Sequence, residues 1–167
     1  MTILDRQEIQ RGLRSLSHGL RRAIEEKAAR QASMIDASAP QLARHPFIDH
    51  WPDRDTDALV ERFRELPCPA LEADGSCSLY EFRPLACRSM GIPVESDGIV
   101  QGACAIQTSV PLVRLSRSLR QEEDRLAGEE AEELAQLRDR QRMPGEELLL
   151  PYAFLPDVFE QPVKEVT

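Results

Sequence analysis

The chain has 167 residues and a formal net charge of −8; 41% of its residues are hydrophobic and 30% are charged. This composition is typical of a globular protein, and we expect residues 1–167 to form a single domain. The negative charge argues against nucleic acid as a partner, because phosphate contacts need a surplus of Lys and Arg. No secretory signal is visible in the charged first residues, and no stretch approaches the roughly 20 apolar residues of a membrane span. We therefore expect a cytoplasmic protein that does not bind membranes.

Helical spacing of apolar residues dominates both ends of the chain. Residues 5–34 predict one helix, because apolar residues recur there every three or four positions. A shorter helix is predicted over 55–66. Helical spacing returns from 110 onward, where Gly128 is a candidate break between two helices. The apolar stretch 148–155 is expected to dock across the body of the protein.

Residues 67–108 follow a different pattern, in which proline and glycine interrupt every short apolar run. We expect one helical turn after Ser78, a short helix over 84–90 and a small β-hairpin over 92–101. Such an irregular segment has no continuous hydrophobic face, so it is expected to bury too little surface to offset the entropy lost on ordering it. A bound metal would supply the missing stabilisation.

The four cysteines of the chain, Cys68, Cys77, Cys87 and Cys104, all lie in this segment. In the reducing cytoplasm they are expected to be free thiols, which become metal ligands on deprotonation. Their spacing lacks the close C-x2-C pairs of common zinc sites, so spacing alone does not identify a metal centre. The alternatives are separate buried cysteines that pack as small hydrophobic side chains, disulfides, and catalytic thiols.

Three residues near Cys87 are candidates to support such a centre. Four thiolates around a divalent ion leave a net charge of roughly −2, and a buried charge of that size needs hydrogen-bond donors or cations close by. Arg83 and Arg88 flank Cys87 and are the natural donors, although ordinary surface salt bridges explain them equally well. Tyr80 is expected to pack beside the cysteines.

The run from Cys68 to Arg88 reads C-P-x-L and then G-x-C-x-L-Y-x-x-R-P-x-x-C-R, and Gly91-Ile92-Pro93 and Cys104 follow it. This pattern resembles the core of the YkgJ-like cysteine-cluster family, whose members are described as zinc- or iron-chelating domains. The resemblance implies that the four cysteines chelate a metal. Some members are labelled flagellin N-methylases or iron–sulfur proteins. Many carry a further cysteine group upstream, whereas this chain has no cysteine before Cys68.

We therefore expect a mainly α-helical fold in which helices pack around a central four-cysteine metal knuckle, residues 66–105, with a small β-hairpin. The function predicted first is metal binding, with one zinc ion or one iron–sulfur cluster held through the four cysteines. The alternatives are an iron–sulfur-dependent enzyme of methyl transfer or redox chemistry, and a metal-free helical interaction module. The sequence leaves open which metal is bound, whether the protein is an enzyme and whether it has a protein partner.

Overall fold

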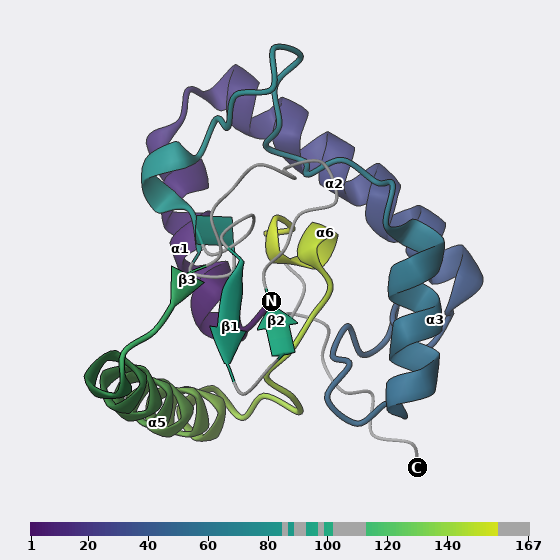
Figure 1. Ribbon diagram of the computed structural model, residues 1–167. Helices are drawn as coiled ribbons and strands as arrows, with labels where there is room; N and C mark the ends of the chain where they lie inside the picture. The colour runs from purple at the N-terminus through teal and green to yellow at the C-terminus, as the bar shows by residue number, and fades with distance from the viewer. Residues whose placement is uncertain (85–86, 89–92, 97–98, 102–112, 157–167) are drawn as a thin grey trace.

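The computed structural model describes residues 1–84, 87–88, 93–96, 99–101 and 113–156. Helices dominate this part of the chain, as predicted, and the short α6 lies near the centre between longer helices (Figure 1). The elements are, in chain order, α1 (Ile3–Ser15), α2 (His18–Ser38), α3 (Asp53–Phe63), the 3₁₀ helix η1 (Tyr80–Phe82), β1 (Val94–Ser96), β2 (Ile99–Gln101), β3 (Val113–Arg114), α5 (Arg117–Gln141) and α6 (Leu150–Ala153).

The single helix predicted over 5–34 is in fact two helices, because the chain leaves the helical conformation between α1 and α2. Leu16 is extended, with φ −78° and ψ 159°. Ser17 then begins α2, and its side-chain oxygen accepts a hydrogen bond from the backbone N–H of Leu20 at 3.4 Å, as a helix cap does. Leu16 and Leu20 nevertheless both pack against the hydrophobic core. The apolar spacing therefore continues through the break and does not reveal it.

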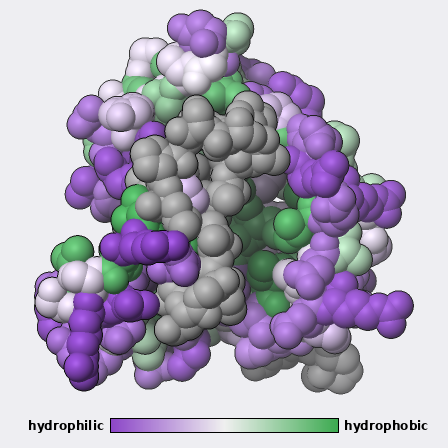
Figure 2. Space-filling view, in the orientation of Figure 1, coloured by the Kyte–Doolittle hydropathy of each residue, from purple (hydrophilic) through white to green (hydrophobic). Residues whose placement is uncertain are grey.

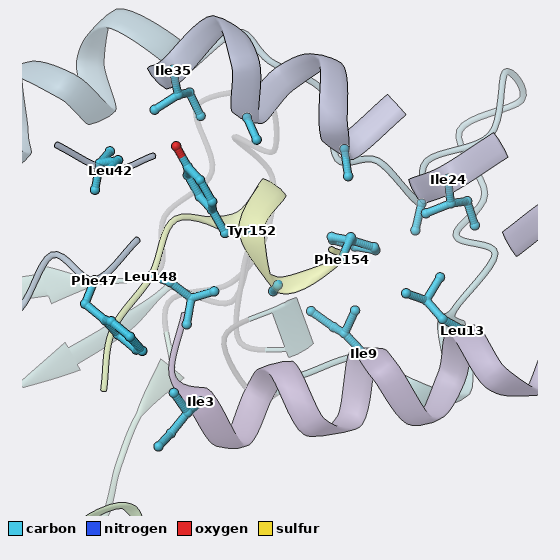
Figure 3. Close-up of a cluster of buried hydrophobic side chains, with 14 of the residues drawn as sticks. Ile3, Ile9, Leu13, Ile24, Ile35, Leu42, Phe47, Leu148, Tyr152 and Phe154 are labelled. Atoms are coloured by element: carbon cyan, nitrogen blue, oxygen red, sulfur yellow. The ribbon is translucent and has the colours of Figure 1, made fainter. Parts of the chain in front are cut away.

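The hydrophobic core is centred on α6, which contacts both α1 and α2. Figure 3 shows side chains of these three helices pointing toward one another. Leu148 and Phe154 are buried. The Tyr152 hydroxyl donates to Asp36 Oδ1 of α2 at 2.5 Å, which ties α6 to that helix. The prediction that the stretch 148–155 docks across the body is confirmed.

A small β-sheet contains the predicted hairpin. β1 pairs antiparallel with β2, and Ser96 lies opposite Ile99. β3 pairs parallel with the other edge of β1, a strand that the sequence pattern did not predict. The helix expected from 110 onward therefore begins only at Arg117, where Ser116 Oγ accepts a hydrogen bond from Leu119 N at 3.3 Å.

α5 is one continuous helix, so Gly128 does not divide it. Leu134 and Leu137 are buried, but Leu119 and Leu126 are 56% and 51% exposed. The first half of α5 therefore lies outside the core that its apolar spacing suggested, and hydrophilic side chains cover much of it (Figure 2). No helix in the described ranges is both long enough and apolar enough to cross a membrane.

Candidate metal centre

The first predicted ligand, Cys68, lies in a turn that two side chains of α2 hold in place. Leu71 N donates to Cys68 O at 3.1 Å, which closes the turn. Lys27 Nζ donates to Cys68 O at 2.9 Å and to Leu71 O at 3.2 Å. Gln31 Nε2 donates to the carbonyl oxygen of Pro67 at 2.8 Å. The carbonyls on both sides of Cys68 are therefore satisfied from one helix.

A second tight turn brings Cys77 back beside this one. Leu71 and Cys77 form an isolated antiparallel bridge, and Ser78 N donates to Ala70 O at 3.0 Å. Between them Gly75 has φ +84°, a left-handed conformation that glycine adopts without the steric penalty of a side chain. Because the chain reverses here, Cys68 and Cys77 are brought to the same region despite the eight residues between them.

The third ligand, Cys87, follows η1 and is itself in helical conformation. Its backbone is held by Arg83, whose guanidinium donates to the Cys87 carbonyl oxygen. Arg88 reaches back in the same way, with Nε donating to Arg83 O at 2.9 Å and Nη2 to Glu81 O at 3.0 Å. Both arginines therefore donate to backbone carbonyls of this segment, and the Arg88 side chain is exposed.

The segment that carries the first two cysteines is also anchored by its own hydrophobic contacts. Ala70 and Leu79 are 2% and 3% exposed and belong to the core. Phe82 lies so close to Gly12 of α1 that a Cβ added at Gly12 would meet Phe82 Cβ at 2.8 Å. The expectation that this segment buries too little surface does not hold throughout residues 67–84, because Ala70 and Leu79 lie in the core and Phe82 packs against it, although Leu71 and Tyr80 are exposed.

The three cysteines that the structure describes line one cavity of about 510 Å³. The cysteines are partly exposed, and no disulfide links them. Tyr80 and Arg83 also line the cavity, and the Arg83 guanidinium lies 5.4 Å from the centre of the Tyr80 ring. Tyr80 lines the same cavity as the cysteines but is 60% exposed, so much of its ring faces solvent. The described lining comprises Ile9, Cys68, Ala70, Leu71, Gly75, Ser76, Cys77, Leu79, Tyr80, Phe82, Arg83, Pro84, Cys87, Leu150 and Phe154.

The cavity wall favours the neutral form of its thiols. Burial raises the pKa of the Cys68 thiol; the Ala70 N–H, which hydrogen-bonds to the sulfur, opposes this rise, the neighbouring thiols add to it, and the Lys27 cation lowers it. Burial also raises the pKa of Cys87, against the lowering effect of the Arg83 guanidinium. Such thiols are protonated at neutral pH, and a thiophilic cation would displace their protons on binding. The donor set therefore fits a metal that thiolates prefer.

The fourth predicted ligand, Cys104, lies outside the described residues. Among the residues that are described, no three His, Cys, Asp or Glu side chains are arranged so that they could hold a metal ion as they stand. The four-cysteine knuckle predicted at the centre of the fold is thus not seen as a formed centre in this part of the chain. What the structure shows is the common cavity of three thiols.

No protein-family model, no curated protein and no solved structure matches this chain. The comparisons therefore neither support nor oppose the resemblance carried by the cysteine motif.

Sequence reasoning missed Lys27 and Gln31 as residues of this site. They are spaced four apart on α2 and therefore share one helix face. Lys27 is 41 residues away from Cys68 in the chain. The local sequence contains no signal for this contact, because it depends on how α2 packs against the Cys68 turn.

Proposed function

We propose that this protein binds one metal centre, a zinc ion or an iron–sulfur cluster, through Cys68, Cys77, Cys87 and Cys104. The observation that supports the proposal is the shared cavity of the first three thiols, which come from three separate positions along residues 68–87. The centre would organise residues 66–105 between the helices. Free thiols suit a reducing compartment, so the proposal includes a cytoplasmic location.

Partial exposure of the thiols favours this proposal over the alternative of core cysteines. A cysteine that serves only as a small hydrophobic side chain is normally among the most buried residues. Cys68, Cys77 and Cys87 are each partly exposed at a cavity wall, and none of them is among the buried core residues that the structure describes, although Cys68 and Cys77 pack against that core. Sulfur atoms at a cavity wall are placed to reach a ligand.

Four thiolates suit either a tetrahedral zinc or an iron–sulfur cluster, so the number of ligands does not choose between them. The described thiols would have to change their arrangement for either, because they do not form a metal-holding group as they stand. Binding would therefore be coupled to a local rearrangement, and it would release the protons that the thiols carry.

A second candidate function is an enzyme of methyl transfer or redox chemistry that uses the same centre. Its support is the size of the cavity, about 510 Å³. This lies within the roughly 300–1,000 Å³ typical of small-molecule sites, and it exceeds the volume that a single ion occupies. A metal-free helical interaction module is a third candidate, supported by the exposed Leu119 and Leu126 of α5.

The test is elemental analysis, acid-labile sulfide analysis and an absorption spectrum of protein purified without oxygen. The control is the variant in which all four cysteines are serine. One zinc per chain and no visible bands would identify a zinc site, whereas iron with equimolar sulfide and visible charge-transfer bands would identify a cluster. Wild-type protein that carries no more metal than the serine variant, even after reconstitution, would contradict the proposal.

A further inference from the structure

Two donors on one face of α2 hold the backbone around Cys68. Lys27 donates from its ammonium group to two carbonyl oxygens, those of Cys68 at 2.9 Å and Leu71 at 3.2 Å. One helical turn later, Gln31 donates from its amide to the Pro67 carbonyl at 2.8 Å. Gln31 is buried and Lys27 is partly buried, so neither side chain is free to move as a surface residue is.

The side chains of Lys27 and Gln31 differ in charge. Both fix the carbonyls next to Cys68, but Gln31 is neutral whereas Lys27 carries a full positive charge. A centre with four thiolates around a divalent ion has a formal charge of roughly −2, and a nearby cation stabilises it more strongly where the surroundings are partly desolvated. Lys27 Nζ lies 2.9 Å from the carbonyl oxygen of a ligand residue itself, and its charge acts on the thiol of that residue.

On the basis of the metal centre proposed above, we propose that Lys27 is a positioning residue of that centre, which orients the Cys68 turn through two carbonyls and offsets the negative charge of the thiolates. Arg83 has the corresponding positioning role at Cys87, because its guanidinium donates to the Cys87 carbonyl oxygen. Each of these two ligands is thus held through its own carbonyl by a cation, which comes from the distant helix α2 at Cys68 and from the same local segment at Cys87.

The experiment measures zinc affinity of the reduced, metal-stripped full chain by competition with a chelator. Lys27→Met removes both the charge and the donors, Lys27→Arg keeps both, and Gln31→Met removes only a neutral donor. Arg30→Met is the matched control, because Arg30 is an exposed cation on the same helix. We expect Lys27→Met to bind zinc about 10–100-fold more weakly, the usual effect of losing a residue that supports metal ligands. Lys27→Arg and Arg30→Met should bind as the wild type does.

Gln31→Met tests whether Lys27 affects zinc binding through its charge or only through its hydrogen bonds to the Cys68 turn. We expect it to weaken zinc binding less than Lys27→Met, even though it also frees a carbonyl of the Cys68 turn. Thermal unfolding of the metal-stripped variants shows whether each still folds, and hydrogen exchange of residues 68–78 shows whether the turn has loosened. Equal loss of zinc affinity in the two variants, with equal loosening, would overturn the role of the charge.

The outcomes distinguish this inference from the proposal on which it rests. Wild-type zinc affinity in Lys27→Met would overturn the role of Lys27 and leave the metal centre intact. A wild-type protein that binds neither zinc nor iron would overturn the metal centre itself, and the role of Lys27 with it.

Discussion

Arg83 holds the backbone at Cys87 through a hydrogen bond to the Cys87 carbonyl oxygen, and Cys87 lines the same cavity as Cys68 and Cys77. We predict that Cys87→Ser loses its metal. Its metal affinity should fall by more than about 100-fold, which is the largest usual effect of losing a residue that only supports a metal ligand. A hydroxyl is a poor ligand for a thiophilic metal, because it stays protonated at neutral pH. Metal content and competition with a chelator measure the loss.

Ser76→Ala is the control for that substitution, since Ser76 also lines the cavity but is not among the expected ligands. It should retain metal. If Cys87→Ser retained metal as well, with the thermal stability of the wild type, Cys87 would be a packing thiol and not a ligand.

Among the elements, α1 approaches η1 so closely that one position tolerates no side chain. A Cβ at Gly12 would lie 2.8 Å from Phe82 Cβ, 2.9 Å from Phe82 Cγ and 3.0 Å from Leu79 Cδ2. We predict that Gly12→Ala lowers the free energy of unfolding by about 1 kcal/mol, because overpacking costs roughly 1–3 kcal/mol and the better helix propensity of Ala returns about 1. Gly12→Ala should also weaken metal binding, since Phe82 and Leu79 anchor the segment between Cys77 and Cys87 against the core.

Gly128→Ala is the matched control in α5, where no atom lies within 4 Å of the added Cβ. It should raise the free energy of unfolding by about 0.5–1 kcal/mol through helix propensity alone. Urea unfolding of both variants measures the two effects. An equal gain in both would show that α1 and η1 do not pack as closely as described.

The docking of α6 onto α2 gives a pH-dependent prediction. Burial, together with the hydrogen bond to Asp36 and its charge, raises the pKa of Tyr152 well above its usual value of about 10. The folded state therefore keeps this proton where the unfolded chain has lost it, so the stabilisation is complete below pH about 10 and falls as the pH rises further.

At neutral pH we predict that Tyr152→Phe lowers the free energy of unfolding by about 1–2 kcal/mol, because a hydrogen bond to a carboxylate is lost. The difference between wild type and variant should shrink as the pH rises above about 10, because the wild type alone loses stability through this group. Denaturant unfolding between neutral and alkaline pH measures it. A difference that stays constant with pH would contradict the role of the Tyr152–Asp36 pair.

Elements with a strong local pattern were predictable from the sequence. The hairpin of β1 and β2 and the docking of 148–155 both follow from local apolar patterns and turn residues. The break at Ser17 was not predictable from spacing, because Leu16 and Leu20 on its two sides both still face the core. At the site, all four cysteines lie in one segment of the sequence, which predicted that they lie close together, and the three described ones share a cavity. The contact of Lys27 with Cys68 was not predictable in this way, because it depends on how α2 packs.

At the scale of the whole molecule, the core around α1, α2 and α6 has no cysteine among the buried residues of the described ranges. We predict that removing the metal leaves most of the far-UV circular-dichroism signal, because these helices bury their apolar faces against one another. Residues 67–84 should also resist protease, since Ala70 and Leu79 are in the core. New cleavage should appear after Pro84, in the part that carries Cys87 and Cys104. Limited proteolysis with mass spectrometry locates the sites.

Rapid cleavage throughout 67–84 on metal removal would contradict that picture, because the apolar anchors of this segment would then depend on the metal. Loss of the helical signal together with the metal would show that the centre holds the entire fold and not one segment of it.

The most direct test of the central claim is the alkylation rate of each cysteine, measured by mass spectrometry in metal-loaded and metal-stripped protein. A single centre held by four ligands protects Cys68, Cys77, Cys87 and Cys104 together, in proportion to the metal bound. We predict this common protection at one centre per chain, with all four thiols reactive once the metal is removed. Cys104 reacting equally fast in both forms would contradict the four-ligand centre, and equal rates for all four would contradict metal binding at this site.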